Sequence, residues 1–295
     1  MLALAGSVSA QEPIVNYDNS IRLEYQFIHT GDYGTSFGPL NLGETDAHII
    51  ILSGNFSLSE RWSVFGSIPW VQKRHEGEFP HDPNIDFVEF EPPDLRVIDD
   101  GTFHGGLQDF FAGVQYRALD GPLSISPYVS YGVPVTNYPF YGSAAIGKQI
   151  WQLPLGAYFQ YIPYFSDWDF QADIAYVLSE KVLGVNLNYW LMYFSASYYV
   201  TPRFAPRIYL RKRMTPGGLR YPEDFTDDYS FDDFDNEFFY MHDRTIKHDY
   251  LDAGVGFDYV VNNRYTVSGA FYKTVKSDNV AGVDYAFTFS LARNF

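Results

Sequence analysis

Four arginines near position 210 have the residue type and spacing to act on a charged solute. They are Arg203, Arg207, Arg211 and Arg213, and the apolar residues Ile208 and Leu210 alternate with them. Successive side chains of a β-strand point to opposite faces, so a single strand would place all four guanidinium groups on one side. On the lumen wall of a barrel, such a column could orient or select a solute.

Six carboxylates lie at the matching parity of other amphipathic stretches, and we expect them to oppose the arginines. They are Glu24, Asp109, Asp169, Asp173, Asp252 and Asp258. One interpretation is a polarised lining along which a solute moves. The other is a set of ion pairs that fill a narrow interior, because the side chains of a small β-barrel can fill it completely.

Acidic and aromatic residues alternate between positions 223 and 243, in a pattern that could hold a divalent cation. The central acids are Asp227, Asp228, Asp232, Asp233 and Asp235. Ca²⁺ takes roughly six to eight oxygen ligands, although the spacing here does not fit an EF-hand loop. The alternatives are recognition of an outside partner and a solvated acidic loop. No cofactor is expected beyond this possible Ca²⁺.

Two His-Asp pairs follow that segment: His242 with Asp243, and His248 with Asp249. A hydrolase could use such a pair, but no serine nucleophile has a suitable spacing to either histidine. We therefore expect polar rim residues, and no enzyme activity.

Twelve amphipathic stretches of about 10–15 residues predict the elements that position these groups. This length suits strands that cross a membrane at a tilt, which need about 9–11 residues. The predicted strands span 20–30, 46–57, 62–75, 105–118, 123–134, 149–163, 168–178, 184–200, 203–214, 246–261, 264–276 and 281–295.

Short and long links alternate between these stretches, which favours an antiparallel β-barrel with tight periplasmic turns and long outside loops. Residues 76–100 and 223–243 each hold nine acids, half of the chain's 36. We therefore predict an all-β fold, a single antiparallel transmembrane β-barrel of about twelve strands over 20–295 with long acidic extracellular loops. Pro69, Pro127 and Pro154 cannot donate to the ladder and predict local irregularities, which could open a lateral path for a hydrophobic solute.

The composition agrees with a membrane barrel and excludes several classes of protein. Aromatics make up 19% of the 295 residues, cysteine is absent, and the formal net charge is -16. Disulfide frameworks and thiolate metal sites are excluded, and a nucleic-acid partner is not expected, because a polyanion would be repelled. Trp62 and Trp168 near one set of strand ends, with Trp70 and Trp151 near the other, predict two interfacial aromatic girdles.

The two ends of the chain also fit this class. The small residues Val8, Ser9 and Ala10 resemble a cleavage site, so residues 1–10 are interpreted as the remnant of a signal peptide and 11–19 as a periplasmic segment. The last predicted strand ends on Phe295, as the closing strands of Gram-negative outer-membrane barrels do.

Two segments resemble a known family. The sequence is ERWSVFGSIPWV at 60–71 and GGLQDFFAGVQYR at 105–117. These resemble the phenol meta-pathway degradation family of outer-membrane barrels, also described as transporter-like, over about a third of the chain. Gln108 stands where that family commonly has glycine. The resemblance implies a barrel that admits hydrophobic or aromatic compounds.

The favoured hypothesis is an outer-membrane channel for small solutes, including hydrophobic or aromatic ones. The alternative is a closed structural barrel that displays its acidic, aromatic loops to an extracellular or assembly partner. The expected surroundings are outer-membrane lipid and lipopolysaccharide, to which divalent cations could bridge the acidic loops.

Overall fold

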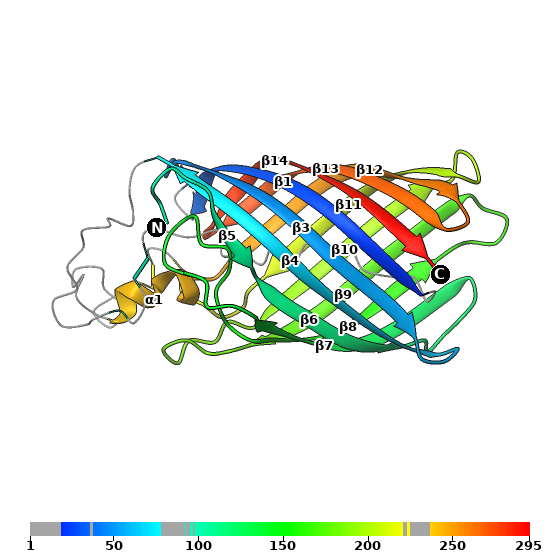
Figure 1. Ribbon diagram of the computed structural model, residues 1–295, viewed down its shortest axis with the longest axis horizontal. Coiled ribbons are helices and arrows are strands. Elements are labelled where there is room, and N and C mark those ends of the chain that lie inside the picture. The colour runs from blue at the N-terminus through cyan, green and yellow to red at the C-terminus, as the bar shows by residue number, and fades with distance from the viewer. Residues whose placement is uncertain are drawn as a thin grey trace.

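A closed antiparallel β-barrel with twelve wall strands makes up most of the described chain (Figure 1). The computed structural model describes residues 19–35, 38–77, 92, 95–96, 98–220, 223–224 and 237–295. The predicted fold class is confirmed. Residues 1–18, which hold the predicted signal remnant and nearly all of the predicted periplasmic segment, lie outside the described residues.

Strands β5 and β6 together form one interrupted wall strand, since both pair with β4. Strand β2 lies outside the count of twelve, because it only extends a hairpin with β1. The strands are β1 (Ser20–Thr35), β2 (Gly38–Leu40), β3 (Glu44–Ser57), β4 (Trp62–Glu76), β5 (His104–Leu107), β6 (Asp109–Tyr116), β7 (Leu123–Pro134), β8 (Gln152–Tyr161), β9 (Trp168–Ser179), β10 (Tyr189–Tyr198), β11 (Phe204–Met214), β12 (Asp249–Asn262), β13 (Tyr265–Asp278) and β14 (Val280–Asn294).

The first and last strands pair with each other and close the sheet. Strand β14 pairs with β1 from Ser20↔Asn294 to Gly34↔Val280, and every other wall strand pairs with its neighbours in sequence. Closure of this kind satisfies the backbone groups that an open sheet would leave at its edges, as a hydrocarbon environment requires.

The barrel buries polar side chains in its interior and exposes apolar side chains on its outer surface, which is the reverse of a soluble protein. Along β1, the inward Glu24 and Gln26 are at most 4% exposed, whereas the outward Leu23 is 53% exposed. Large apolar side chains are exposed in the same way on the other wall strands, for example Ile208 and Phe289. An apolar belt around a polar interior is the pattern of a membrane β-barrel.

The wall is irregular where β5 passes into β6. Strand β5 pairs with β4 from Trp70↔Leu107, while β6 pairs with β4 from Ser67↔Phe111, so the register shifts by one residue. Gln108 fills the break, and its backbone N–H donates to the carbonyl of Pro69 at 3.0 Å. Pro69 has no N–H of its own to offer, which confirms the predicted irregularity at this proline.

The other two prolines behave differently. Pro127 pairs with Ala157 without a shift of register, so the prediction of irregular pairing is wrong there. Pro154 pairs with Val177 on β9, but the ladder between β7 and β8 skips Pro154 and Leu153, which confirms a local irregularity without a shift of register.

The two ends of the barrel differ. Tight links lie at the end where β14 finishes, and the longer links lie at the opposite end, together with α1 (Figure 1). We call this second end the mouth; it carries the links 98–103, 135–151, 180–188 and 215–248.

The mouth contains structure that the sequence pattern does not predict. The helix α1 (Glu237–Thr245) lies in a link that was expected to be a loop. The predicted strands 149–163 and 184–200 begin later, at Gln152 and Tyr189, because their first residues turn into the mouth. Within the described residues, no helix is long and apolar enough to cross a membrane.

A charge on the outward face of β11 tests the lipid-facing surface. Leu210 is 46% exposed in the middle of the strand, so Leu210→Arg should lower the unfolding free energy in lipid by about 2–4 kcal/mol. Urea titration in vesicles measures this difference. Asn263→Arg, in the exposed tight turn between β12 and β13, is the control and should have almost no effect. Equal, small effects of both substitutions would mean that this face contacts water.

Candidate functional site

The arginine column lies on β11, whose odd-numbered side chains point into the barrel. Arg207 and Arg213 are buried, and the Arg211 side chain is 12% exposed. The alternation of residue types predicts this placement. That these groups line a solute path remains a prediction.

Arg203 does not join the column, which differs from the expectation. The pairing of β10 with β11 ends at Ser197↔Arg207, and Arg203 lies in the exposed turn before β11. Its backbone N–H donates to Thr201 Oγ1 at 3.2 Å, and its carbonyl accepts from the N–H of Val260 at 2.8 Å. Its position has the same parity as the inward-facing arginines, but it precedes the first residue of β11, Phe204.

Arg211 and Asp252 form the tightest charge pair of the lumen. They are direct partners across β11 and β12, and Arg211 donates to Asp252 Oδ2 from Nε at 2.9 Å and from Nη2 at 2.6 Å. Thr274 Oγ1 donates to the other carboxylate oxygen at 2.6 Å. The guanidinium also lies 4.6 Å from the ring centroid of Tyr272, within cation–π range. The contacts described for this pair are therefore all with side chains of the wall strands β11, β12 and β13.

The other two lumen arginines are held differently. Arg207 lies 3.5 Å from Asp258, whose side chain is 32% exposed. Arg213 stacks over the ring of Tyr189 at 3.8 Å. Arg211, in the middle of the column, therefore has a shorter ion pair than Arg207, which lies nearer the tight-turn end.

The remaining predicted carboxylates also lie inside the barrel, and neutral side chains donate to them. Tyr128 Oη donates to Asp173 at 3.0 Å, and Tyr138 Oη donates to Asp109. The amides of Gln160 and Gln171 donate to Asp169 at 2.9–3.1 Å, and that of Gln26 donates to Glu24. At Asp109 and Asp173, the hydrogen-bond donors are therefore neutral tyrosine hydroxyls and not arginines.

A segment of the 135–151 link folds into the mouth, and we call residues 138–150 the plug. Eleven of its thirteen residues are buried, including Ala144, Ala145 and Ile146 at 3% exposure or less. Its small and apolar side chains pack against the inward faces of β3 and β4 through Ala47, Ile49 and Val71.

Polar side chains of the wall bind the plug backbone. Lys73 Nζ, on β4, donates to the carbonyl of Ala145 at 2.6 Å, and the Gln108 amide donates to the carbonyl of Ile146. The same residue that fills the wall break thus also fixes the plug. Asp99 accepts the N–H groups of Ser143 and Ala144 at 2.8 Å.

The helix side of the mouth binds the plug as well. Asp243 accepts the N–H of Gly142 at 3.0 Å, and Lys148 Nζ donates to the carbonyls of Ile246 at 2.8 Å and Arg244 at 3.4 Å. Arg244 in turn donates to the carbonyl of Gln149 at 3.0 Å and lies over Phe140. The plug is therefore held between the wall and α1.

The predicted His-Asp pairs belong to this packing. His242 Nε2 lies 3.3 Å from Asp243, and both side chains are at most 1% exposed. Since Asp243 also binds the plug backbone, the first pair joins α1 to the plug. Of the second pair, His248 is fully buried, and Asp249 accepts the N–H of Thr215 at 2.6 Å and lies 2.9 Å from Lys247.

Burial changes the protonation of two groups at the mouth. It lowers the pKa of Lys148 well below its ordinary value, Arg213 and Arg244 lower it further, and Asp243 opposes them. Burial likewise lowers the pKa of His248, with Lys148 and Arg213 acting in the same direction and Asp243 against them.

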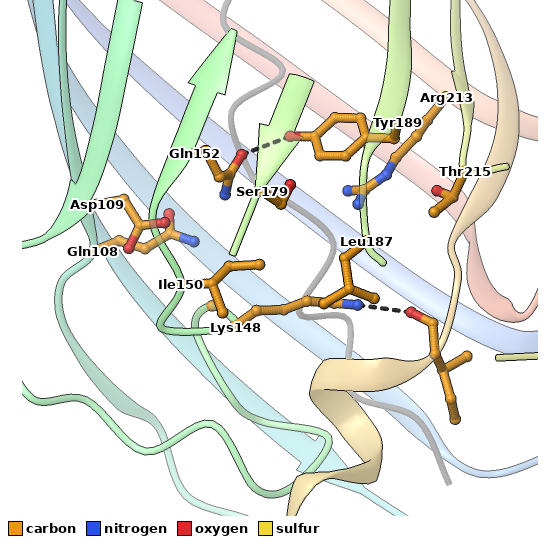
Figure 2. A pocket seen from close by; sticks show the side chains of 12 residues that line it. Gln108, Asp109, Lys148, Ile150, Gln152, Ser179, Leu187, Tyr189, Arg213 and Thr215 are labelled. Atoms are coloured by element: carbon orange, nitrogen blue, oxygen red, sulfur yellow. Dashed lines mark hydrogen bonds between the residues drawn. The ribbon is translucent and has the colours of Figure 1, made fainter. Parts of the chain in front are cut away.

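Two cavities adjoin the plug. The first has a free volume of about 20 Å³ and lies between the plug and β11, with Lys148, Arg213, Tyr189 and Gln152 in its lining (Figure 2). The second measures about 290 Å³ and lies between β5 and the plug. Its lining is mostly apolar and consists of Arg96, Ile98, His104, Gly105, Tyr138, Pro139, Ala144 and Ile146.

The second cavity lies beside the wall break, where β5 pairs with β4 alone. Its volume approaches the usual range for small-molecule pockets, about 300–1,000 Å³. Among the described strands, β5 has no ladder partner on its other side.

The four tryptophans that are predicted to form the girdles lie on the outer surface or near it. Trp62 and Trp168 start β4 and β9 at the tight-turn end and contact the rings of Tyr116 and Tyr198. Trp151 is exposed near the mouth, and Trp70 is half-buried on β4. Their role in two interfacial girdles remains a prediction.

The acidic cluster Asp227, Asp228, Asp232, Asp233 and Asp235 lies outside the described residues. In the part of the chain that the structure describes, no group of three or more His, Asp or Glu side chains is placed to hold a metal ion. A Ca²⁺ site in this loop remains a prediction.

The sequence analysis missed the plug and its anchors Lys73, Gln108 and Lys148. One signal could have identified the plug. The segment 139–147, PFYGSAAIG, has no acidic residue, unlike the other long links. Small and apolar residues without charge are typical of a buried segment.

Removing one partner of the Arg211 pair should cost more than removing one partner of the Arg207 pair. Asp252→Ala leaves a buried guanidinium without its carboxylate, which should lower the unfolding free energy by about 3–5 kcal/mol. Asp258→Ala removes a longer, more exposed contact and should cost about 1 kcal/mol or less. Urea unfolding of both variants in vesicles measures the difference. Equal costs would show that Arg211 does not depend on Asp252.

Comparison with known proteins supports the fold. No family model matches the chain, and no curated protein matches its sequence. An outer membrane channel from Pseudomonas putida F1 superposes with a TM-score of 0.67 at 11% identity, over 94% of this chain and 96% of that one. The β domain of the Bordetella autotransporter BrkA gives 0.52 at 9% identity, over 94% and 100%. The translocator domain of the autotransporter NalP from Neisseria meningitidis gives 0.50 at 10%, over 94% and 88%. The chain has the fold of bacterial outer-membrane β-barrels.

Proposed function

We propose that the protein is a passive outer-membrane channel for small organic solutes, hydrophobic or aromatic ones among them. The observation that carries this proposal is the mostly apolar cavity of about 290 Å³ between the plug and β5, which pairs with β4 alone among the described strands. A solute in this cavity contacts apolar side chains, with Arg96 and His104 at its rim.

The path has two parts in this proposal. The polar interior, with its charges on β6, β9, β11 and β12, serves the tight-turn end of the barrel. The plug separates it from the mouth, so passage needs a displacement of residues 138–150. The hydrogen bonds that hold the plug join side chains to backbone atoms outside the strand ladders, so breaking them leaves the pairing of the wall intact.

A second candidate function is the closed barrel that displays its mouth loops to a partner. The firm attachment of the plug favours it, because a filled mouth conducts nothing. The fold does not decide between the two, since it superposes on a channel and on autotransporter domains alike.

Single-channel recording in a planar bilayer separates the two functions. A channel gives discrete, salt-dependent steps, whereas a folded protein without steps supports the closed barrel. Heat-modifiable gel migration establishes that the refolded protein is folded.

Asp173→Asn tests whether the lumen carboxylates lie on the path. Asparagine can still accept the hydrogen bond from Tyr128 but removes one negative charge. The permeability ratio of K⁺ to Cl⁻, from reversal potentials in a KCl gradient, should fall about twofold or more. An unchanged ratio in a conducting channel would place the ion path away from Asp173.

Gly106→Leu tests the apolar cavity. A Cβ at this position would meet only Ile146 Cδ1, at 3.9 Å, so the side chain fits and extends towards the plug. Uptake of a single-ring aromatic hydrocarbon into proteoliposomes should fall several-fold, while KCl conductance stays near the wild-type value. Unchanged uptake would show that apolar solutes do not use this cavity.

A further inference from the structure

Two cations from different elements meet at the small cavity between the plug and the wall. Lys148 comes from the plug and Arg213 from β11, and both residues are at most 7% exposed. Figure 2 shows the two side chains extending to the same side of the cavity, beside Leu187 and Tyr189. Gln152 and Ser179 add neutral polar groups to the lining.

Among the described residues, cations outnumber carboxylates around this cavity. Its lining holds Lys148, Arg213 and one carboxylate, Asp109, which accepts a hydrogen bond from Tyr138. Arg244 and Asp243 also act on the charge of Lys148, in opposite directions. Buried cations are costly without nearby anions or hydrogen-bond acceptors. Lys148 finds two backbone carbonyls, which leaves the third hydrogen of its ammonium group for another acceptor.

His248 does not line the cavity itself, but it adds a second observation beside it, because the charges of Lys148 and Arg213 both act on it. Its side chain is fully buried, and neither ring nitrogen has a hydrogen-bond partner. The charged groups facing it are Lys148 of the plug, Arg213 of β11, Lys73 of β4 and Asp243 of α1. A buried imidazole without a partner, surrounded mainly by cations, indicates an acceptor that the protein itself does not provide.

We propose that Lys148, Arg213 and His248 form a binding site for the carboxylate group of a solute. A carboxylate would accept from the Lys148 ammonium and balance the excess positive charge. The free volume of about 20 Å³ takes a group of this size, not a whole ring, so the rest of a larger solute must lie outside the cavity. The inference rests on the proposed function for its solute and adds that solutes with a carboxylate are selected.

Protonation should strengthen this site. In the empty site, the pKa of His248 lies below its ordinary value of 6.5. A bound carboxylate favours the imidazolium, so binding takes up a proton, and affinity rises as the pH falls through the range below that value. His248→Gln should reduce this pH dependence, and the part that remains belongs to Lys148, whose pKa burial also lowers.

Formate is a suitable probe, because it is the smallest carboxylate. Its binding to the refolded full-length protein in micelles can be followed by the line width of ¹³C-formate at constant ionic strength. Wild type should broaden the signal saturably, and Lys148→Met should weaken binding on the order of tenfold or more. Lys181→Met, which removes an exposed lysine from the neighbouring 180–188 link, is the matched control and should bind as wild type does.

Two results would overturn the site: no saturable binding to folded wild type, or equal binding by wild type and Lys148→Met. If Lys148→Met fails to fold by gel migration, Arg213→Gln takes its place with the same expectation. Planar-bilayer conductance separates this inference from the proposed function. Conduction without formate binding removes only the site, whereas formate binding without conduction removes only the channel.

Discussion

Closure of the sheet between β1 and β14 is the constraint on which the rest of the structure depends. In hydrocarbon, an unpaired backbone N–H or C=O costs several kcal/mol, so a sheet in a membrane must pair its first and last strands. Thirteen residue pairs join β1 to β14 here. Once the wall is closed, the alternation of side chains leaves only two environments, lipid and lumen. Apolar residues take the first and the charged groups of β9, β11 and β12 take the second.

The lumen divides into a rigid part and an adjustable one. At the level of Arg211, cross-strand ion pairing and hydrogen bonding join three neighbouring strands. Towards the mouth, the polar contacts go instead to backbone atoms of the plug and of the segment after α1. Contacts within a wall are fixed by strand register, whereas contacts to a loop can be exchanged. A rearrangement of the lumen is therefore easiest at the mouth, where the hydrogen bonds go to the backbone of the plug.

Much of the barrel could be predicted from the sequence, because strand alternation is a local property. The parity of Arg207, Arg211 and Arg213 follows from residue types alone, as does the break at Pro69. The plug could not be predicted in the same way, since residues 138–150 form no repeating pattern and acquire their burial from distant residues such as Lys73 and Asp243. Arg203 shows the same limit, because the parity of a residue does not tell where the strand begins. The site formed by Lys148, Arg213 and His248 joins three segments far apart in sequence.

The most direct test of a solute path through the mouth is to fix the plug and then release it in the same protein. The chain has no cysteine, so Ala47→Cys with Ile146→Cys introduces the only thiols, on a wall residue and a plug residue of one packed cluster. A short cross-linker that contains a cleavable disulfide joins them. Planar-bilayer conductance is then recorded before and after adding a reductant. The account predicts few or no steps while the plug is fixed and wild-type steps after reduction. Equal conductance in both states, or silence of the reduced and folded protein, would contradict it.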